Sequence, residues 1–166
     1  MNESLRRVLK WIRYALFFLF LAFLETSDLA FLSAFRPALL LSAVLSVSLC
    51  EGIECGTVFG LCAGIFGAAF GETGFSLLPL LYTGVGFFSG VIADRFDAGR
   101  KWLVFALLSA LFSLLGEGVV FLRVNATWSD SVLEEVFRKL LLPGFLSTFL
   151  FSFPIFGVFL LLKGKK

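Results

Sequence analysis

Histidine is absent from this 166-residue sequence. The chain therefore lacks the side chain that most often binds metals and moves protons near neutral pH. The three cysteines, Cys50, Cys55 and Cys62, form no C-x-x-C pair, so no thiol metal site or redox pair is indicated. A nucleophile elbow and a phosphate-binding Gly-Lys-Ser/Thr motif are also missing, which leaves no catalytic constellation to assign. We expect no enzyme activity, no cofactor or metal, and no nucleic-acid partner.

Apolar residues, in contrast, are abundant. They make up 59% of the chain and include 23 phenylalanines, and the mean hydropathy is +0.98. A soluble fold of this length could not bury so much apolar surface. The segments 38–50, 55–71, 74–93, 102–116 and 140–162 contain no charged residue. Each is long enough to cross, or nearly cross, a hydrocarbon core of roughly 30 Å.

These segments predict an all-α integral membrane protein that forms one polytopic domain over residues 1–166. The apolar stretch that follows Arg13 reads as a retained first helix. Six transmembrane helices are expected near residues 11–24, 37–50, 55–71, 75–93, 102–122 and 140–162.

The distribution of Lys and Arg predicts the orientation. With six crossings and both termini in the cytoplasm, ten of the fourteen basic residues lie inside: Arg6, Arg7, Lys10, Arg13, Arg95, Arg100, Lys101, Lys163, Lys165 and Lys166. The four outside are Arg36, Arg123, Arg138 and Lys139. This excess follows the positive-inside rule.

A further amphipathic segment is expected at 131–139, on the outer face. Ser131 and Glu134 have the spacing of a capping box, and apolar residues follow them. Such a segment is typical of a helix that lies on the membrane surface in contact with lipid.

Small residues recur at helical spacing. On the third expected helix they are Gly52, Gly56, Gly60, Gly64, Gly67 and Gly71, on the second Ala38, Ser42 and Ser46, and on the fourth Gly86 and Gly90. Small residues allow helices to pack closely in a membrane, where lipid supplies no hydrophobic drive for association. We expect the second and third helices to form a tight pair, although the same face could instead receive a helix from another protein.

Glu117 is the candidate functional acid, because ionisable residues within membrane helices are often functional. A packing or interfacial role and a contact with a partner or ligand are both open for it.

The order of features resembles the bacterial rod shape-determining protein MreD family. The resemblance is carried by Phe35-Arg36-Pro37 before the second helix, Gly56-Thr57 in the third, a basic loop after the fourth, and Ser152-Phe153-Pro154-Ile155 in the last. A basic tail, Lys163-Gly164-Lys165-Lys166, is also similar. One departure is Gly67-Ala68-Ala69, where the family often has an acidic residue, so the role of that acid is not transferred.

This resemblance implies a non-enzymatic scaffold in the inner membrane that supports peptidoglycan synthesis and cell-shape control as part of the cell-elongation complex. It implies an MreC-type partner, and further partners of the RodA, penicillin-binding transpeptidase and MreB types. It also implies similarity to the fold of energy-coupling-factor substrate components.

The alternative function is a substrate-binding component of an energy-coupling-factor vitamin transporter, which is also a small six-helix protein. Such components contact their energising partner through small residues on the first helix. Here that helix contains only Ala15 and Ala22 as small residues around Phe17–Leu21, which favours the scaffold.

Overall fold

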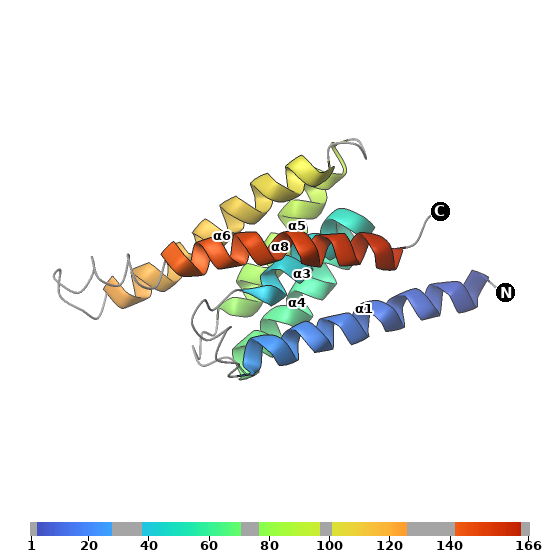
Figure 1. The fold of residues 1–166 in the computed structure, drawn as a ribbon, viewed down its shortest axis with the longest axis horizontal. Helices are drawn as coiled ribbons and strands as arrows, with labels where there is room; N and C mark the ends of the chain where they lie inside the picture. The colour runs from blue at the N-terminus through green and yellow to red at the C-terminus, as the bar shows by residue number, and fades with distance from the viewer. Residues whose placement is uncertain (1–2, 28–37, 71–76, 97–100, 126–141, 164–166) are drawn as a thin grey trace.

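The computed structural model describes residues 3–27, 38–70, 77–96, 101–125 and 142–163 (Figure 1). Within these ranges every secondary-structure element is a helix, which confirms the all-α expectation for the described part of the chain. The helices are α1 (Glu3–Thr26), α3 (Leu39–Glu51), α4 (Ile53–Phe70), α5 (Leu78–Ala93), α6 (Lys101–Asn125) and α8 (Leu142–Lys163). Each overlaps one of the six predicted ranges, and the largest difference is at α1, which begins at Glu3 rather than near residue 11. The amphipathic segment expected at 131–139 lies outside the described residues.

Helix α3 is the centre of the bundle. It contacts α1, α4, α5, α6 and α8, and Figure 1 shows it enclosed by the other helices. All residues from Leu39 to Cys50 are buried. A helix with apolar or small residues on every side has no polar face to turn to solvent, so it is stable only when it is surrounded. This composition explains why α3 occupies the core.

The first residues of α1 and the last residues of α8 lie at the same end of the bundle (Figure 1). Between α3 and α4 the chain reverses at Gly52, which has a φ of 93°. The amide of Gly52 donates to the Ser48 carbonyl oxygen at 2.9 Å. Glycine adopts this left-handed conformation without the steric cost that a Cβ imposes.

Phenylalanine rings join the outer helices. Phe18 of α1 meets Phe59 of α4 with ring centroids 4.8 Å apart, and Phe17 of α1 meets Phe159 of α8 at 5.1 Å. The rings of Phe105 in α6 and Phe156 in α8 are stacked, with centroids 4.2 Å apart and planes 8° from parallel. Aromatic pairs of this kind contribute about 0.5–1.5 kcal/mol beyond the area that they bury. Several of the many phenylalanines therefore form contacts between helices.

Candidate functional site

Glycines bring α4 and α5 into backbone contact. A Cβ added to Gly60 would overlap the Tyr82 carbonyl oxygen, and one added to Gly64 would overlap the Cα of Pro79. From the other side, a Cβ on Gly90 would lie 2.6 Å from the Cα of Ile53. These contacts follow one antiparallel register along both helices. No side chain fits between the two backbones, so the glycines are required for this approach.

Three helices meet where Ser48 of α3, Gly56 of α4 and Gly86 of α5 come together. The Ser48 hydroxyl donates to the Gly86 carbonyl oxygen at 2.6 Å. A Cβ on Gly56 would lie 2.5 Å from the Cβ of Ser48, and one on Gly86 would overlap the Gly56 carbonyl oxygen. We call these three residues the Ser48 junction. Its buried hydrogen bond joins α3 to the α4–α5 pair.

The glycine face is divided between two helices. The expected pair of the second and third helices is present, because Gly56 of α4 packs on α3, but Gly60 and Gly64 face α5. The α3 residue in the contact with Gly56 is Ser48. Two residues turn a helix by about 200°, so Ser46 points away from Ser48. The buried stripe of Ala38, Ser42 and Ser46 therefore does not form the contact with Gly56.

The serines of the predicted stripe bond within their own helix. Ser42 donates to the Ala38 carbonyl oxygen at 3.3 Å, and Ser46 donates to that of Ser42 at 2.7 Å. Such bonds to the preceding turn satisfy a buried hydroxyl without a second helix. Nothing in the spacing of small residues along the sequence distinguished Ser48 from Ser42 and Ser46.

Two other predicted glycines play different parts. Gly52 lies in the reversal between α3 and α4, where a Cβ would meet nothing within 4 Å, so its role is conformational. A Cβ on Gly67 would touch only the Leu78 Cδ1 at 3.9 Å, an ordinary contact. Gly71 lies outside the described residues, and so does the side chain of Glu117, whose backbone belongs to α6.

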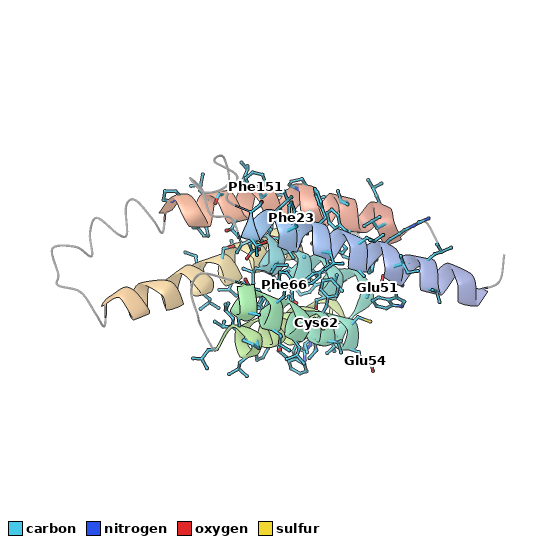
Figure 2. All side chains as sticks on the ribbon, turned by 90° about the horizontal axis from the view of Figure 1, so that it is seen from below. Phe23, Glu51, Glu54, Cys62, Phe66 and Phe151 are labelled. Carbon is cyan, nitrogen blue, oxygen red and sulfur yellow. The ribbon has the colours of Figure 1, made fainter. Side chains whose placement is uncertain are left out.

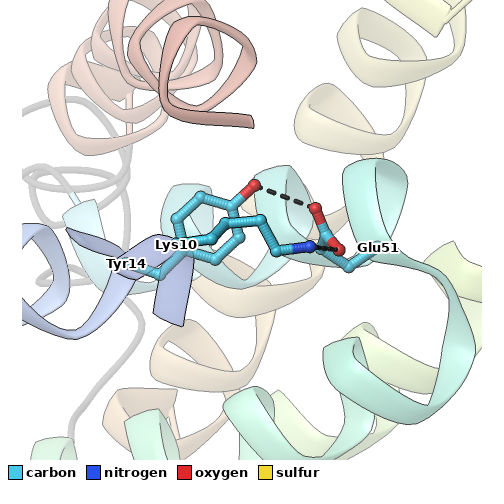
Figure 3. A network of polar contacts seen from close by, with 3 residues as sticks. All are labelled: Lys10, Tyr14 and Glu51. Atoms are coloured by element: carbon cyan, nitrogen blue, oxygen red, sulfur yellow. Dashed lines mark hydrogen bonds and ion pairs between the residues drawn. The ribbon is translucent and has the colours of Figure 1, made fainter. Parts of the chain in front are cut away.

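A polar network joins α1 to the carboxyl end of α3 (Figure 3). The Lys10 Nζ forms an ion pair with the Glu51 Oε2 at 2.6 Å, and the Tyr14 hydroxyl donates to the Oε1 of the same carboxylate at 2.9 Å. The Glu51 side chain is 11% exposed and that of Lys10 28%, so water screens the pair only in part. Nearby, the Lys101 Nζ of α6 donates to the Leu49 carbonyl oxygen at 3.1 Å. A cation is favourable at this end of a helix because the last carbonyl groups lack partners and carry partial negative charge.

The amino end of α3 is capped from other helices. Ala38 provides no side-chain cap, but the Glu25 Oε2 of α1 accepts from the Leu40 amide at 2.7 Å. The Thr148 Oγ1 of α8 accepts from the Ala38 amide at 3.0 Å. A carboxylate at this end satisfies free amides and complements the helix dipole. Both ends of α3 are therefore closed by side chains that are distant in the sequence.

The described charged side chains gather at the two ends of the bundle. The end with the Lys10–Glu51 pair also carries Arg13, Glu54 and Lys101, and Figure 2 shows Glu51 and Glu54 at this end. Among the described residues, the opposite end carries the charged side chain of Glu25. Between the two, the described side chains of all six helices are uncharged.

Large apolar side chains project from every outer helix in this middle region. Examples that are more than half exposed are Leu16 on α1, Val58 on α4, Leu80 on α5, Leu107 on α6 and Leu150 on α8. In the described part of the chain one segment is long and apolar enough to cross a membrane, Pro143–Leu162 of α8, with a mean hydropathy of 2.2. Four shorter helical segments are also apolar: Leu39–Glu51, Ile53–Ala69, Leu78–Ala93 and Lys101–Gly116. The arrangement with six crossings stays a prediction.

The described residues contain no group of three His, Cys, Asp or Glu side chains that could hold a metal ion. Comparison with protein-family models, curated proteins and solved structures gives no match for this chain.

Proposed function

We propose that this chain is a protein of the bacterial inner membrane that crosses the membrane six times, with both termini in the cytoplasm, and that it serves as a non-enzymatic scaffold of the cell-elongation complex. The membrane location is supported by one observation: the middle of the bundle exposes apolar side chains and lies between two charged ends. Soluble monomers rarely expose contiguous apolar patches of more than a few hundred Å². Here exposed Leu, Val, Ile and Phe side chains occur on all five helices around α3.

The proposed orientation is supported by the basic residues. Lys10 and Lys101 lie at the carboxyl end of α3, at the end of the bundle where α1 begins and α8 ends. Further basic residues close to them in the sequence are Arg6, Arg7, Arg13, Arg95 and Arg100. Trp11 and Trp102 are exposed beside Lys10 and Lys101. Tryptophan and lysine at one level are typical of the boundary between hydrocarbon and water, and a basic excess is typical of the cytoplasmic side.

The scaffold part rests on the MreD-like order of features, and the packing narrows which surfaces remain for partners. Gly56, Gly60 and Gly64 are covered by α3 and α5 of the same chain, which disfavours the idea that this face receives a helix from another protein. The partner helices of an MreC-type, RodA-type or transpeptidase protein would instead contact the outer faces of α1, α6 and α8, and the basic end would face MreB. A fold like that of energy-coupling-factor substrate components is part of the same proposal.

Copurification tests the scaffold role. The tagged protein, extracted in mild detergent, should retain an MreC-type protein, and its depletion should round the cells. Single substitutions on three outer helices, Leu16→Trp, Leu107→Trp and Leu150→Trp, locate the interface because all three side chains are exposed. At least one should weaken capture while the unfolding midpoint of the isolated protein stays unchanged.

The same experiment can refute the proposal. A bound vitamin, or a pair of ATPases in the eluate, would indicate the transporter component instead. Normal cell shape after depletion would also exclude the scaffold role.

A further inference from the structure

The helices of this bundle differ greatly in length. The central α3 has 13 residues and α5 has 16, so at 1.5 Å per residue they are about 20 Å and 24 Å long. Helix α4, with 18 residues, is about 27 Å long. By the same measure α1, α6 and α8, with 24, 25 and 22 residues, are each about 33 Å long or more. Three helices are thus shorter than a hydrocarbon core of roughly 30 Å, and any tilt shortens their span further.

The polar groups at the ends of α3 show that its shortness is not compensated by apolar neighbours. The Glu25 carboxylate lies at the Leu40 amide, and the Lys10–Glu51 ion pair lies at the other end. Leu40 and Glu51 are separated by about 17 Å along the helix axis. In a bilayer of ordinary thickness at least one of these charged groups would be held inside the hydrocarbon, which costs several kcal/mol.

Two of the three short helices lie together on one side of the central α3. Helices α4 and α5 pack against each other through their glycines, and Figure 2 shows this pair on the side of the bundle away from α8. On α4 the charge-free segment begins directly after Glu54, which is exposed. In Figure 1, α6 and α8 extend past the ends of α3, α4 and α5.

We infer that the α4–α5 side of this protein is matched to a hydrocarbon layer of about 24 Å, and that it binds phospholipids with short acyl chains in preference to longer ones. This inference rests on the proposed membrane location. The partner is lipid rather than a second protein, because the exposed apolar band runs over all the outer helices and ends at charged groups and tryptophans on one side. A bilayer meets a short apolar span by thinning locally, at a modest cost for each Å of mismatch.

The test uses the full chain in vesicles of monounsaturated phosphatidylcholines with fourteen, sixteen, eighteen or twenty carbons per acyl chain. Relative lipid binding is measured with a brominated phosphatidylcholine that quenches a single tryptophan, introduced at the exposed Val58 of α4 after Trp11, Trp102 and Trp128 are replaced by Phe. The thermal unfolding midpoint is followed by circular dichroism. The fourteen- or sixteen-carbon lipid should bind best, by about twofold over the twenty-carbon lipid, and should give the highest midpoint.

Two variants make the test specific to the α4–α5 side. Glu54→Leu extends the charge-free part of α4 by its first two residues, about 3 Å, so the preference should move towards longer chains. Glu54→Gln removes the charge but keeps a polar group there, and should shift the preference less. A flat response, or an optimum at eighteen or twenty carbons for the unchanged protein, would overturn the inference. If the protein does not float with the vesicles at all, the proposed membrane location itself is wrong.

Discussion

The hydroxyl group of Ser48 donates a hydrogen bond of 2.6 Å to the backbone carbonyl oxygen of Gly86. This bond joins the central helix to α5 at the place where Gly56 of α4 leaves room for both. A bond between a side chain and a carbonyl group that already belongs to a helix adds an attachment without disturbing that helix. It ties α3 directly to the glycine contact of α4 and α5.

Replacing Ser48 with Ala should destabilise the protein by about 0.5–1.5 kcal/mol, because the buried bond to Gly86 is lost. The free energy of unfolding in detergent micelles measures this. Ser46→Ala is the matched control, since Ser46 is also buried but bonds only to its own helix, and it should change stability by less. Equal effects of the two substitutions would show that the bond between helices contributes nothing.

Substitutions at two glycines on α5 distinguish the effect of packing on stability from the effect of helix propensity. Gly86→Ala should destabilise by about 1–3 kcal/mol, because the new methyl group overlaps the backbone of Gly56. At Gly84 a Cβ meets nothing within 4 Å, so Gly84→Ala should be neutral or stabilise by up to about 1 kcal/mol through better helix propensity. Thermal unfolding of both variants in the same detergent gives the comparison. Similar midpoints for both would contradict the α4–α5 contact described above.

The Lys10–Glu51 pair can be measured with a double-mutant cycle. Lys10→Met leaves the mostly buried carboxylate without its cation and should cost about 1–3 kcal/mol. In Lys10→Met/Glu51→Gln the loss should be smaller than the sum of the two single losses, with a coupling energy of about 1 kcal/mol. Additive losses would mean that the pair is fully screened by solvent. High salt should reduce the coupling only in part, since Glu51 is 11% exposed.

The reversal at Gly52 tests a conformational requirement. Gly52→Ala should destabilise by about 1–2 kcal/mol, because a Cβ is strained at a φ of 93° even though the space around it is open. Gly116→Ala in α6 is the control, as its space is equally open and no positive φ occurs there. The prediction fails if Gly52→Ala unfolds at the same temperature as the unchanged protein or above it.

The positions of the helices could be predicted from the sequence because charge-free apolar segments and helices coincide in this chain. The segment 38–50 became α3 (Leu39–Glu51), and 102–116 lies within α6. The start of α1 was missed because residues 3–10 carry charges and so lie outside any apolar segment, although a helix continues there. Hydropathy reports where a chain is apolar, whereas helix formation also extends into polar residues.

The contacts between helices could be predicted less well from the sequence. The repeat of Gly56, Gly60 and Gly64 correctly indicated a face made for close approach, but nothing in the spacing states which helix covers it. In the structure Gly60 and Gly64 contact Tyr82 and Pro79 of α5, the helix that follows in the sequence, rather than the helix that precedes. Glu25 and Lys101 are further cases, because each closes an end of α3 from a distant part of the sequence. No local pattern encodes such pairings.

The most direct test of the account is the membrane topology of the chain. In a variant with the three native cysteines replaced, single cysteines are introduced at Ser4, Asp130 and Lys165, and a thiol reagent that cannot cross membranes is applied to intact and to permeabilised cells. Asp130→Cys should react in intact cells, whereas Ser4→Cys and Lys165→Cys should react only after permeabilisation. Labelling of the two termini from opposite sides, or release of the protein from membranes at alkaline pH, would contradict a bundle that crosses the membrane six times.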